Sequence, residues 1–133
     1  MKYTTLGKTG LKASRLGFGC MRLPMKDGEV DREKSTPMLR SAFDMGVNLF
    51  DTAIGYCGGD SQKAVGEALE PIRDQVIVST KNHLHHADPD EWWQALENSL
   101  EYLRTDYIDI YNHHGINWKL FQEKLDPDNG GLT

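Results

Sequence analysis

Three side chains of the sequence could together transfer a proton, and two of them end apolar segments. Asp51 ends the segment 47–51, Tyr56 lies five positions further on, and Lys81 ends the segment 75–81. A free phenol, with a pKa of about 10, gives up its proton reluctantly at pH 7, whereas a neighbouring ammonium group favours the phenolate and lowers that pKa. A carboxylate can hold such a lysine in place. Together the three residue types predict an acid catalyst, whereas each residue alone also fits a plain structural role.

Histidines supply a fourth kind of reactive group. His113 and His114 end the apolar segment 107–114, and a histidine there could donate to a substrate carbonyl and orient it. All five histidines fall in two loops that we expect to be neighbours: His83, His85, His86, His113 and His114. Imidazoles bind zinc, copper and nickel, but no acidic or thiol partner stands at a recognised ligand spacing. Metal binding therefore stays open as an alternative, and no metal ligands are assigned.

The elements that must position these residues alternate between short apolar runs and amphipathic stretches, a pattern typical of parallel α/β folds. A hairpin is predicted over 2–14, with Gly7 and Gly10 at its turn. The predicted strands cover 15–23, 47–51, 75–81 and 107–115. The predicted helices run from Thr36 and Pro37 to Gly46, from Asp60 or Ser61 to Pro71, and from Asp88 and Pro89 onward, with a further start in 116–125.

Apolar residues at helical spacing predict the buried side of each helix. These residues are Leu39, Ala42 and Phe43 in the first helix, Ala64, Val65, Ala68 and Leu69 in the second, and Trp92, Trp93, Leu96, Leu100 and Leu103 in the third. Four parallel strands with connecting helices make half of a (β/α)8 barrel, which typically needs about 250 residues. In such folds reactive groups lie at the carboxyl ends of the strands, where Asp51, Lys81 and the histidine pair stand.

Composition limits the partners. The chain has 133 residues, a formal net charge of −5 and a pI near 5.5, so no excess of Lys and Arg exists to neutralise nucleic acid or an anionic membrane. No signal peptide and no apolar segment of membrane-spanning length is visible, which predicts a cytoplasmic protein. Cys20 and Cys57 are too few and too far apart for a disulfide framework, and we expect both to be reduced thiols.

Four separated segments resemble signature segments of the aldo-keto reductase family, in the same order and at similar spacing. The segments are LGKTGLKASRLGFGCMRLP, GVNLFDTAIGY, VIVSTK and SLEYLRTDYIDIYNHHG, and the likeness covers nearly the whole chain to about residue 118. The resemblance implies a (β/α)8 TIM-barrel fold, with about the first four units present after an N-terminal β-hairpin. It also implies reduction of aldehyde and ketone carbonyls with NADP(H), on a small-molecule substrate and without a metal.

The same resemblance implies a catalytic tetrad. Asp51 would position Lys81, Lys81 would lower the pKa of Tyr56, and Tyr56 would act as general acid. His114 matches the tetrad histidine, because the family motif has two residues between a strand tyrosine and that histidine; His113 is the alternative.

The resemblance further implies a cofactor-binding segment at the end of the first barrel strand, near the nicotinamide or its ribose. Its expected residues are Gly19, Cys20, Met21 and Arg22, together with Asp51. A glycine-kinked barrel strand is the structural alternative for this segment.

The family's phosphate contacts come largely from the second half of the barrel, which has no counterpart in this sequence. We therefore expect residues 1–133 to be the N-terminal part of a single barrel domain, inactive alone and short of cofactor contacts. Three arrangements remain open: a fragment of a longer enzyme, two copies that close one barrel, and an inert chain. A non-catalytic half-barrel that oligomerises or binds metal through its histidine-rich loops is the alternative function.

Overall fold

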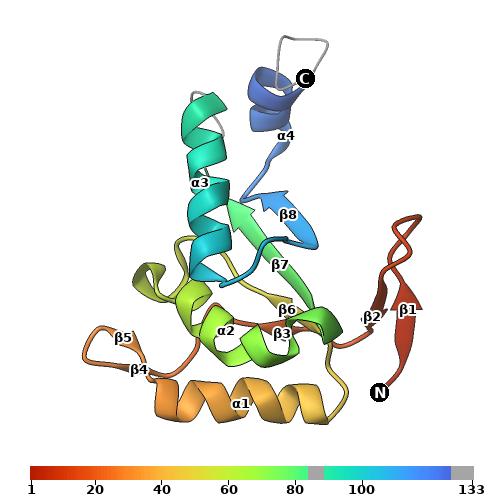
Figure 1. The fold of residues 1–133 in the computed structure, drawn as a ribbon. Helices are drawn as coiled ribbons and strands as arrows, with labels where there is room; N and C mark the ends of the chain where they lie inside the picture. Colours follow the sequence, from red (N-terminus) through yellow and green to blue (C-terminus); the bar gives the residue numbers. More distant parts are fainter. Residues whose placement is uncertain (84–88, 127–133) are drawn as a thin grey trace.

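The computed structural model describes residues 1–83 and 89–126, and its centre is a parallel sheet of four strands. The strands lie in the order β3 (Phe18–Gly19), β6 (Leu49–Asp51), β7 (Ile77–Asn82) and β8 (Ile110–His113). The crossovers contain α1 (Arg32–Asp44), α2 (Ser61–Leu69) and α3 (Pro89–Tyr102), as Figure 1 shows. The predicted α/β fold, with the first four units of a (β/α)8 barrel, is confirmed.

Two antiparallel hairpins and several short helical turns complete the architecture. The predicted N-terminal hairpin is confirmed as β1 (Tyr3–Thr5) paired with β2 (Lys12–Ser14). The remaining elements are β4 (Met25–Lys26), β5 (Glu29–Val30), the turns η1 (Tyr56–Gly59) and η2 (Glu70–Gln75), and the turns α4 (Trp118–Leu120) and η3 (Phe121–Leu125) after β8. The predicted cap Asp88 and most of the predicted turn 126–131 lie outside the described residues.

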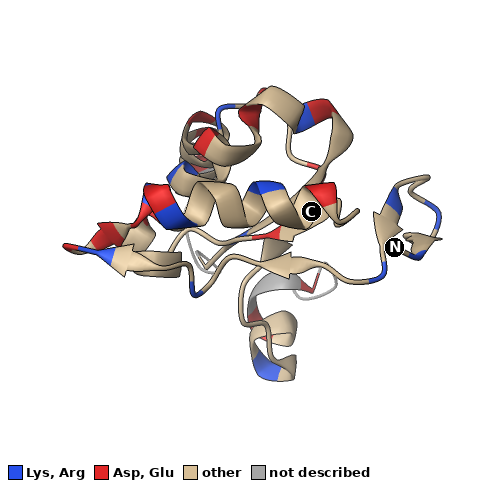
Figure 2. Cartoon of the chain, turned by 90° about the horizontal axis from the view of Figure 1, so that it is seen from below, with Lys and Arg blue, Asp and Glu red and all other residues tan. Residues whose placement is uncertain are grey.

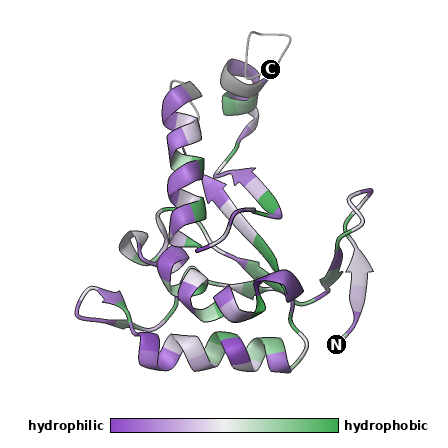
Figure 3. Cartoon of the chain, viewed as in Figure 1, coloured by the Kyte–Doolittle hydropathy of each residue, from purple (hydrophilic) through white to green (hydrophobic). Residues whose placement is uncertain are grey.

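The hydrophobic core lies between the sheet and its first two helices. Phe50 of β6 and Val78 of β7 are buried against Leu39 and Ala42 of α1 and the predicted stripe of α2, all four residues of which are buried. Hydrophobic and hydrophilic residues alternate along both helices (Figure 3). Because successive strand residues point to opposite faces, Asp51 and Ser79 point away from this core.

The first helix begins earlier than predicted. It starts at Arg32 rather than near Thr36, and Pro37 lies inside it. The Asp31 side chain is the N-cap and accepts a hydrogen bond from the Lys34 backbone N–H at 3.3 Å. The predicted stop is confirmed: Gly46 follows the C-cap with a positive φ of 92°, which glycine adopts readily.

Two further details differ from the sequence prediction. Trp93 is 58% exposed, because the buried side of α3 runs through Ala95, Ser99 and the following Leu103. The β4–β5 hairpin was not predicted, although its turn residues Asp27 and Gly28, with φ of 53° and 90°, form an Asp-Gly pair typical of tight hairpins.

An ion-pair cluster fixes the start of α1 against α2. Arg32 donates through Nη2 to Asp60 Oδ1 at 2.9 Å and through Nε to Glu67 Oε2 at 2.9 Å. The Val30 backbone N–H donates to Asp60 Oδ2 at 2.8 Å.

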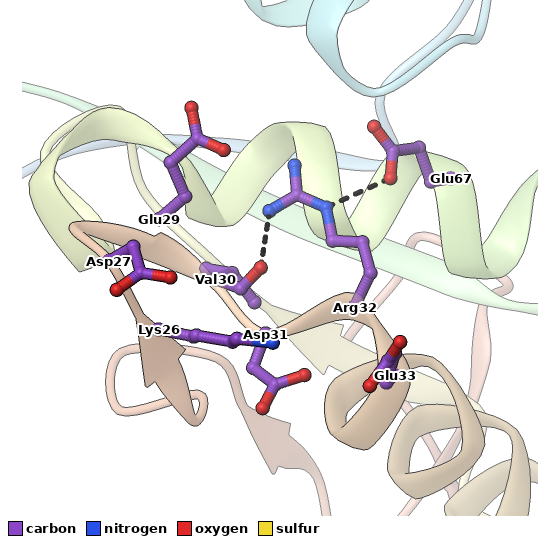
Figure 4. A pocket seen from close by; sticks show the side chains of 8 residues that line it. All are labelled: Lys26, Asp27, Glu29, Val30, Asp31, Arg32, Glu33 and Glu67. Atoms are coloured by element: carbon purple, nitrogen blue, oxygen red, sulfur yellow. Dashed lines mark hydrogen bonds and ion pairs between the residues drawn. The ribbon is translucent and has the colours of Figure 1, made fainter.

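Figure 2 shows acidic and basic residues side by side at this end of α1, and Figure 4 shows Arg32 beside a pocket of about 460 Å³. None of the residues lining that pocket is among the predicted site residues.

Gly66 lets α2 approach the end of α3 closely. A Cβ at Gly66 would lie 2.4 Å from the carbonyl oxygen of Tyr102 and 2.8 Å from the Cα of Leu103. We expect Gly66→Ala to lower the free energy of unfolding by about 3 kcal/mol, measured by urea denaturation, because backbone atoms must separate. This loss outweighs the roughly 1 kcal/mol by which alanine favours a helix. Gly55→Ala, at φ −88° with nothing within 4 Å, is the control, and equal losses in both variants would contradict the packing argument.

The ion pair between Asp60 and Arg32 makes the free energy of unfolding depend on pH. The hydrogen bond from Arg32 holds the pKa of the Asp60 carboxyl below its usual range. A carboxyl with a lowered folded-state pKa stabilises the fold above its unfolded pKa of about 4, and this contribution is lost as the pH falls through the folded-state pKa. Asp60→Asn should therefore destabilise the chain at pH 7, and the difference from wild type should shrink below about pH 4. Asp106→Asn, which removes an exposed carboxyl outside this ion pair, is the control, and an equal change of stability with pH in both variants would contradict the argument.

Candidate active site

The carboxyl ends of the parallel strands bring the predicted reactive residues together. In the sheet register Asp51 pairs with Gly19 on β3 and with Ser79 on β7, and Lys81 pairs with Asn112 on β8. These residues therefore lie side by side at the carboxyl end of the sheet, as the sequence predicts for α/β folds.

Lys81 and Asp51 form an ion pair across β6 and β7. Lys81 Nζ lies 2.6 Å from Asp51 Oδ1, 2.5 Å from Oδ2 and 2.8 Å from the Thr52 carbonyl oxygen. These three acceptors match the three donors of an ammonium group. The Lys81 side chain is 16% exposed and that of Asp51 42% exposed, so the charge pair sits at the rim of the sheet.

Tyr56 stands beside this ion pair. Lys81 Nζ lies 5.2 Å from the centroid of the Tyr56 ring, a distance at which the positive charge acts on the phenol. Tyr56 begins the turn η1, in which Cys57, Gly58 and Gly59 all have positive φ. This left-handed run after the tyrosine lets the chain leave the site sharply and enter α2 at Ser61.

His114 is the histidine that lies against Tyr56. The two rings form an edge-to-face pair with centroids 5.6 Å apart, and the His114 backbone N–H donates to the Asn82 carbonyl oxygen at 2.7 Å. The ring of His113 instead lies 5.9 Å from that of Trp92 on α3. The four residues matched to the tetrad are thus neighbours, whereas the alternative histidine contacts the helix layer.

The predicted cofactor segment follows β3 and is bonded to the strand end that carries Asp51. The Cys20 backbone N–H donates to the Asp51 carbonyl oxygen at 2.8 Å, and Ser61 Oγ donates to the Cys20 carbonyl oxygen at 2.8 Å. The Cys20 side chain is fully buried, and burial, with a smaller contribution from Asp51, raises the pKa of its thiol to about 12. Any role of Cys20 as a ligand contact therefore falls to its backbone, while Met21 and Arg22 are exposed.

Sequence reasoning missed the polar residues that surround the ion pair. Ser79 Oγ donates to Asp51 Oδ1 at 2.9 Å, and Asn112 Nδ2 donates to Ser79 Oγ at 3.1 Å. Thr52 Oγ1 and Ser61 Oγ share a hydrogen bond of 2.8 Å below the loop. The available signal was strand periodicity, because Ser79 lies two residues before Lys81 and thus on the same face of β7.

Metal ligation gains no support from the part of the chain that the structure describes. Within residues 1–83 and 89–126, no three His, Cys, Asp or Glu side chains gather as a metal site. His83 is exposed, and His85 and His86 lie outside the described residues. Both cysteines are free thiols, as predicted. No described helix has the length and apolar character needed to cross a membrane.

Comparisons with known proteins find relatives of this chain among the aldo-keto reductases. The aldo-keto reductase YhdN of Bacillus subtilis (strain 168) is 39% identical over 125 residues, which cover 86% of this chain and 38% of that protein. The holo form of an aldo-keto reductase from Bacillus halodurans superimposes with a TM-score of 0.76 at 33% identity, covering 90% of this chain and 42% of that one.

An aldo-keto reductase from Klebsiella pneumoniae, solved in complex with NADPH, superimposes with a TM-score of 0.70 at 33% identity, covering 79% of this chain and 36% of that one. The chain thus spans about two fifths of the length of the relatives it matches. The model of the aldo/keto reductase family matches residues 15–122, and the chain belongs to that family.

Proposed function

We propose that residues 1–133 are the N-terminal part of a single barrel domain that reduces aldehyde and ketone carbonyls to alcohols with NADP(H). In this proposal Asp51, Tyr56, Lys81 and His114 are the catalytic group. Family membership supports the oxidoreductase class, and the arrangement of these four residues supports the reaction type.

The observation that carries the proposal is the position of the Lys81 ammonium. It is held by both oxygens of Asp51 and lies 5.2 Å from the Tyr56 ring. A positive charge at this position stabilises the phenolate that remains after Tyr56 gives up its proton. The ion pair leaves the ammonium fixed rather than free to swing into solvent.

The residues of the chain have separate tasks in the proposed reaction. Tyr56 donates its O–H proton to the carbonyl oxygen as negative charge develops there, and the resulting phenolate regains a proton from water. Lys81 stabilises the phenolate, and Asp51 holds Lys81. His114, whose ring packs edge to face against Tyr56, donates to the same carbonyl oxygen and orients it.

The strand end beside Asp51 is open at Gly19. A Cβ at Gly19 would meet nothing within 4 Å, so open space adjoins the residue that pairs with Asp51 in the sheet. We propose that Gly19, the Cys20 backbone, Met21, Arg22 and Asp51 contact the nicotinamide or its ribose. When bound, the reduced nicotinamide supplies the hydride that adds to the carbonyl carbon. The NADPH in the Klebsiella pneumoniae relative supports the choice of NADP(H) as the cofactor.

We further propose that a complementary half-barrel supplies the remaining cofactor contacts. Within the described residues β3 and β8 each pair with a single neighbour, so both edges of the sheet are open to further strands. The complement can be further chain or a second copy of this one. The free thiols support a reducing, cytoplasmic location.

Replacing the proposed acid gives the sharpest test of the reaction. Residues 1–133 joined to the C-terminal half of a solved relative should oxidise NADPH with a simple aldehyde, followed by absorbance at 340 nm. Tyr56→Phe in this fusion should lower kcat by about a thousand-fold, because a general acid is removed. Tyr102→Phe, on α3, is the matched control and should keep the rate. An unchanged rate in Tyr56→Phe would refute the catalytic assignment.

The chain alone should behave differently from the fusion. We expect residues 1–133 to show no NADPH oxidation above background, because most phosphate contacts are proposed to lie in the complement. Sedimentation velocity run on the same sample separates a monomer from a self-associated barrel. Robust turnover by a monomer would overturn the proposed need for a complement.

A further inference from the structure

The orientation of the Lys81 ammonium depends on a carboxylate that water can reach. Asp51 is 42% exposed, and rotation about its terminal torsion meets only a shallow barrier. A carboxylate free to rotate would not hold Lys81 in one place. Something besides Lys81 must therefore fix Asp51.

Ser79 supplies that second contact from the neighbouring strand. It is buried on β7 and pairs with Asp51 in the sheet register. Its Oγ lies 2.9 Å from Asp51 Oδ1, the oxygen that also accepts from Lys81 Nζ at 2.6 Å. Asp51 Oδ1 thus accepts hydrogen bonds from both the Ser79 hydroxyl and the Lys81 ammonium.

Asn112 fixes the direction of the Ser79 hydrogen bond. Asn112 Nδ2 lies 3.1 Å from Ser79 Oγ and 3.3 Å from the Thr80 carbonyl oxygen. A carbonyl oxygen only accepts, so the amide group must present its N–H donors to β7. With one N–H directed at Ser79 Oγ, the Ser79 hydroxyl hydrogen is left to point at Asp51.

We propose that Ser79 and Asn112 are positioning residues that orient Asp51 and, through it, Lys81. The hydrogen bonds run in one direction from Asn112 to Ser79 to Asp51, and join β8, β7 and β6 at the level of the reactive groups. We call this chain of hydrogen bonds, from Asn112 through Ser79 to Asp51, the relay. Its relevance to catalysis rests on the proposed function. Its effect on Lys81 does not, because the ion pair exists without cofactor or substrate.

Trace acetylation of residues 1–133 tests whether Ser79 and Asn112 hold the ion pair in place. Native residues 1–133 are treated with a small amount of acetic anhydride, and the labelling of Lys81 is measured by peptide mass spectrometry relative to Lys119, which is 81% exposed. In Ser79→Ala the labelling of Lys81 relative to Lys119, here called the Lys81 ratio, should rise about five-fold. This factor corresponds to the loss of one hydrogen bond that supports the ion pair. Ser79→Thr keeps the hydroxyl and should retain the wild-type ratio.

Asn112 should act through Ser79. Asn112→Leu should raise the Lys81 ratio by about two-fold, and the double variant with Ser79→Ala should equal Ser79→Ala alone rather than the product of both. Because Asn112 is half-exposed, this variant also tests the relay should Ser79→Ala fail to fold.

Ser99→Ala is the matched control, since Ser99 is also buried and donates to the Ala95 carbonyl oxygen within α3. A Lys81 ratio that stays at the wild-type value in Ser79→Ala, or that rises equally in Ser99→Ala or Ser79→Thr, would overturn the inference. A chain that shows the expected labelling but no carbonyl reduction in the fusion would refute the proposed function and leave the relay standing.

Discussion

The ion pair between Lys81 and Asp51 is the interaction on which the site depends. It joins the carboxyl ends of two neighbouring parallel strands, and its geometry follows from their register, in which Asp51 pairs with Ser79. A shift of one residue on β7 would turn Lys81 toward the buried face and leave Asp51 without its cation. The burial of Phe50 and Val78 against the helices holds that register, so the core and the reactive edge depend on each other.

Buried polar contacts beneath the ion pair link it to α2. Ser61, at the start of α2, bonds both the Cys20 carbonyl oxygen and Thr52, and Gln62 Nε2 donates to Thr80 Oγ1 at 2.8 Å. Buried polar groups are costly unless each is bonded, so these contacts favour the observed placement of α2 over the strand ends. Rigid support of this kind suits side chains that must keep a fixed geometry.

The sequence predicts the parallel strands and the strand-end location of the reactive side chains because both follow local patterns. The stripe of α2 and the strand-end location of Asp51 and Lys81 need only periodicity. The start of α1 cannot be predicted from periodicity, because Thr36 and Pro37 are as good a local signal as Asp31. The observed start is stabilised by the pairing of Arg32 with Asp60 and Glu67, which lie 28 and 35 positions away. Ser79 and Asn112 carry no chemical signature of their own, and their part is visible only when their partners are known.

The surface beside the open edge of β3 is largely apolar. A groove there is lined largely by apolar residues of β3, α1 and the segments next to them, among them Leu16, Met38 and Met45, which are 62%, 40% and 70% exposed. Exposed methionines beside the edge of β3 that no described strand covers form an adaptable apolar surface that a further helix and strand could bury. The reactive edge needs no such cover, because its charges are paired within β6 and β7. Pairing the charges of the proposed catalytic group and closing the sheet are therefore separate physical problems, and contacts within the four strands solve only the first.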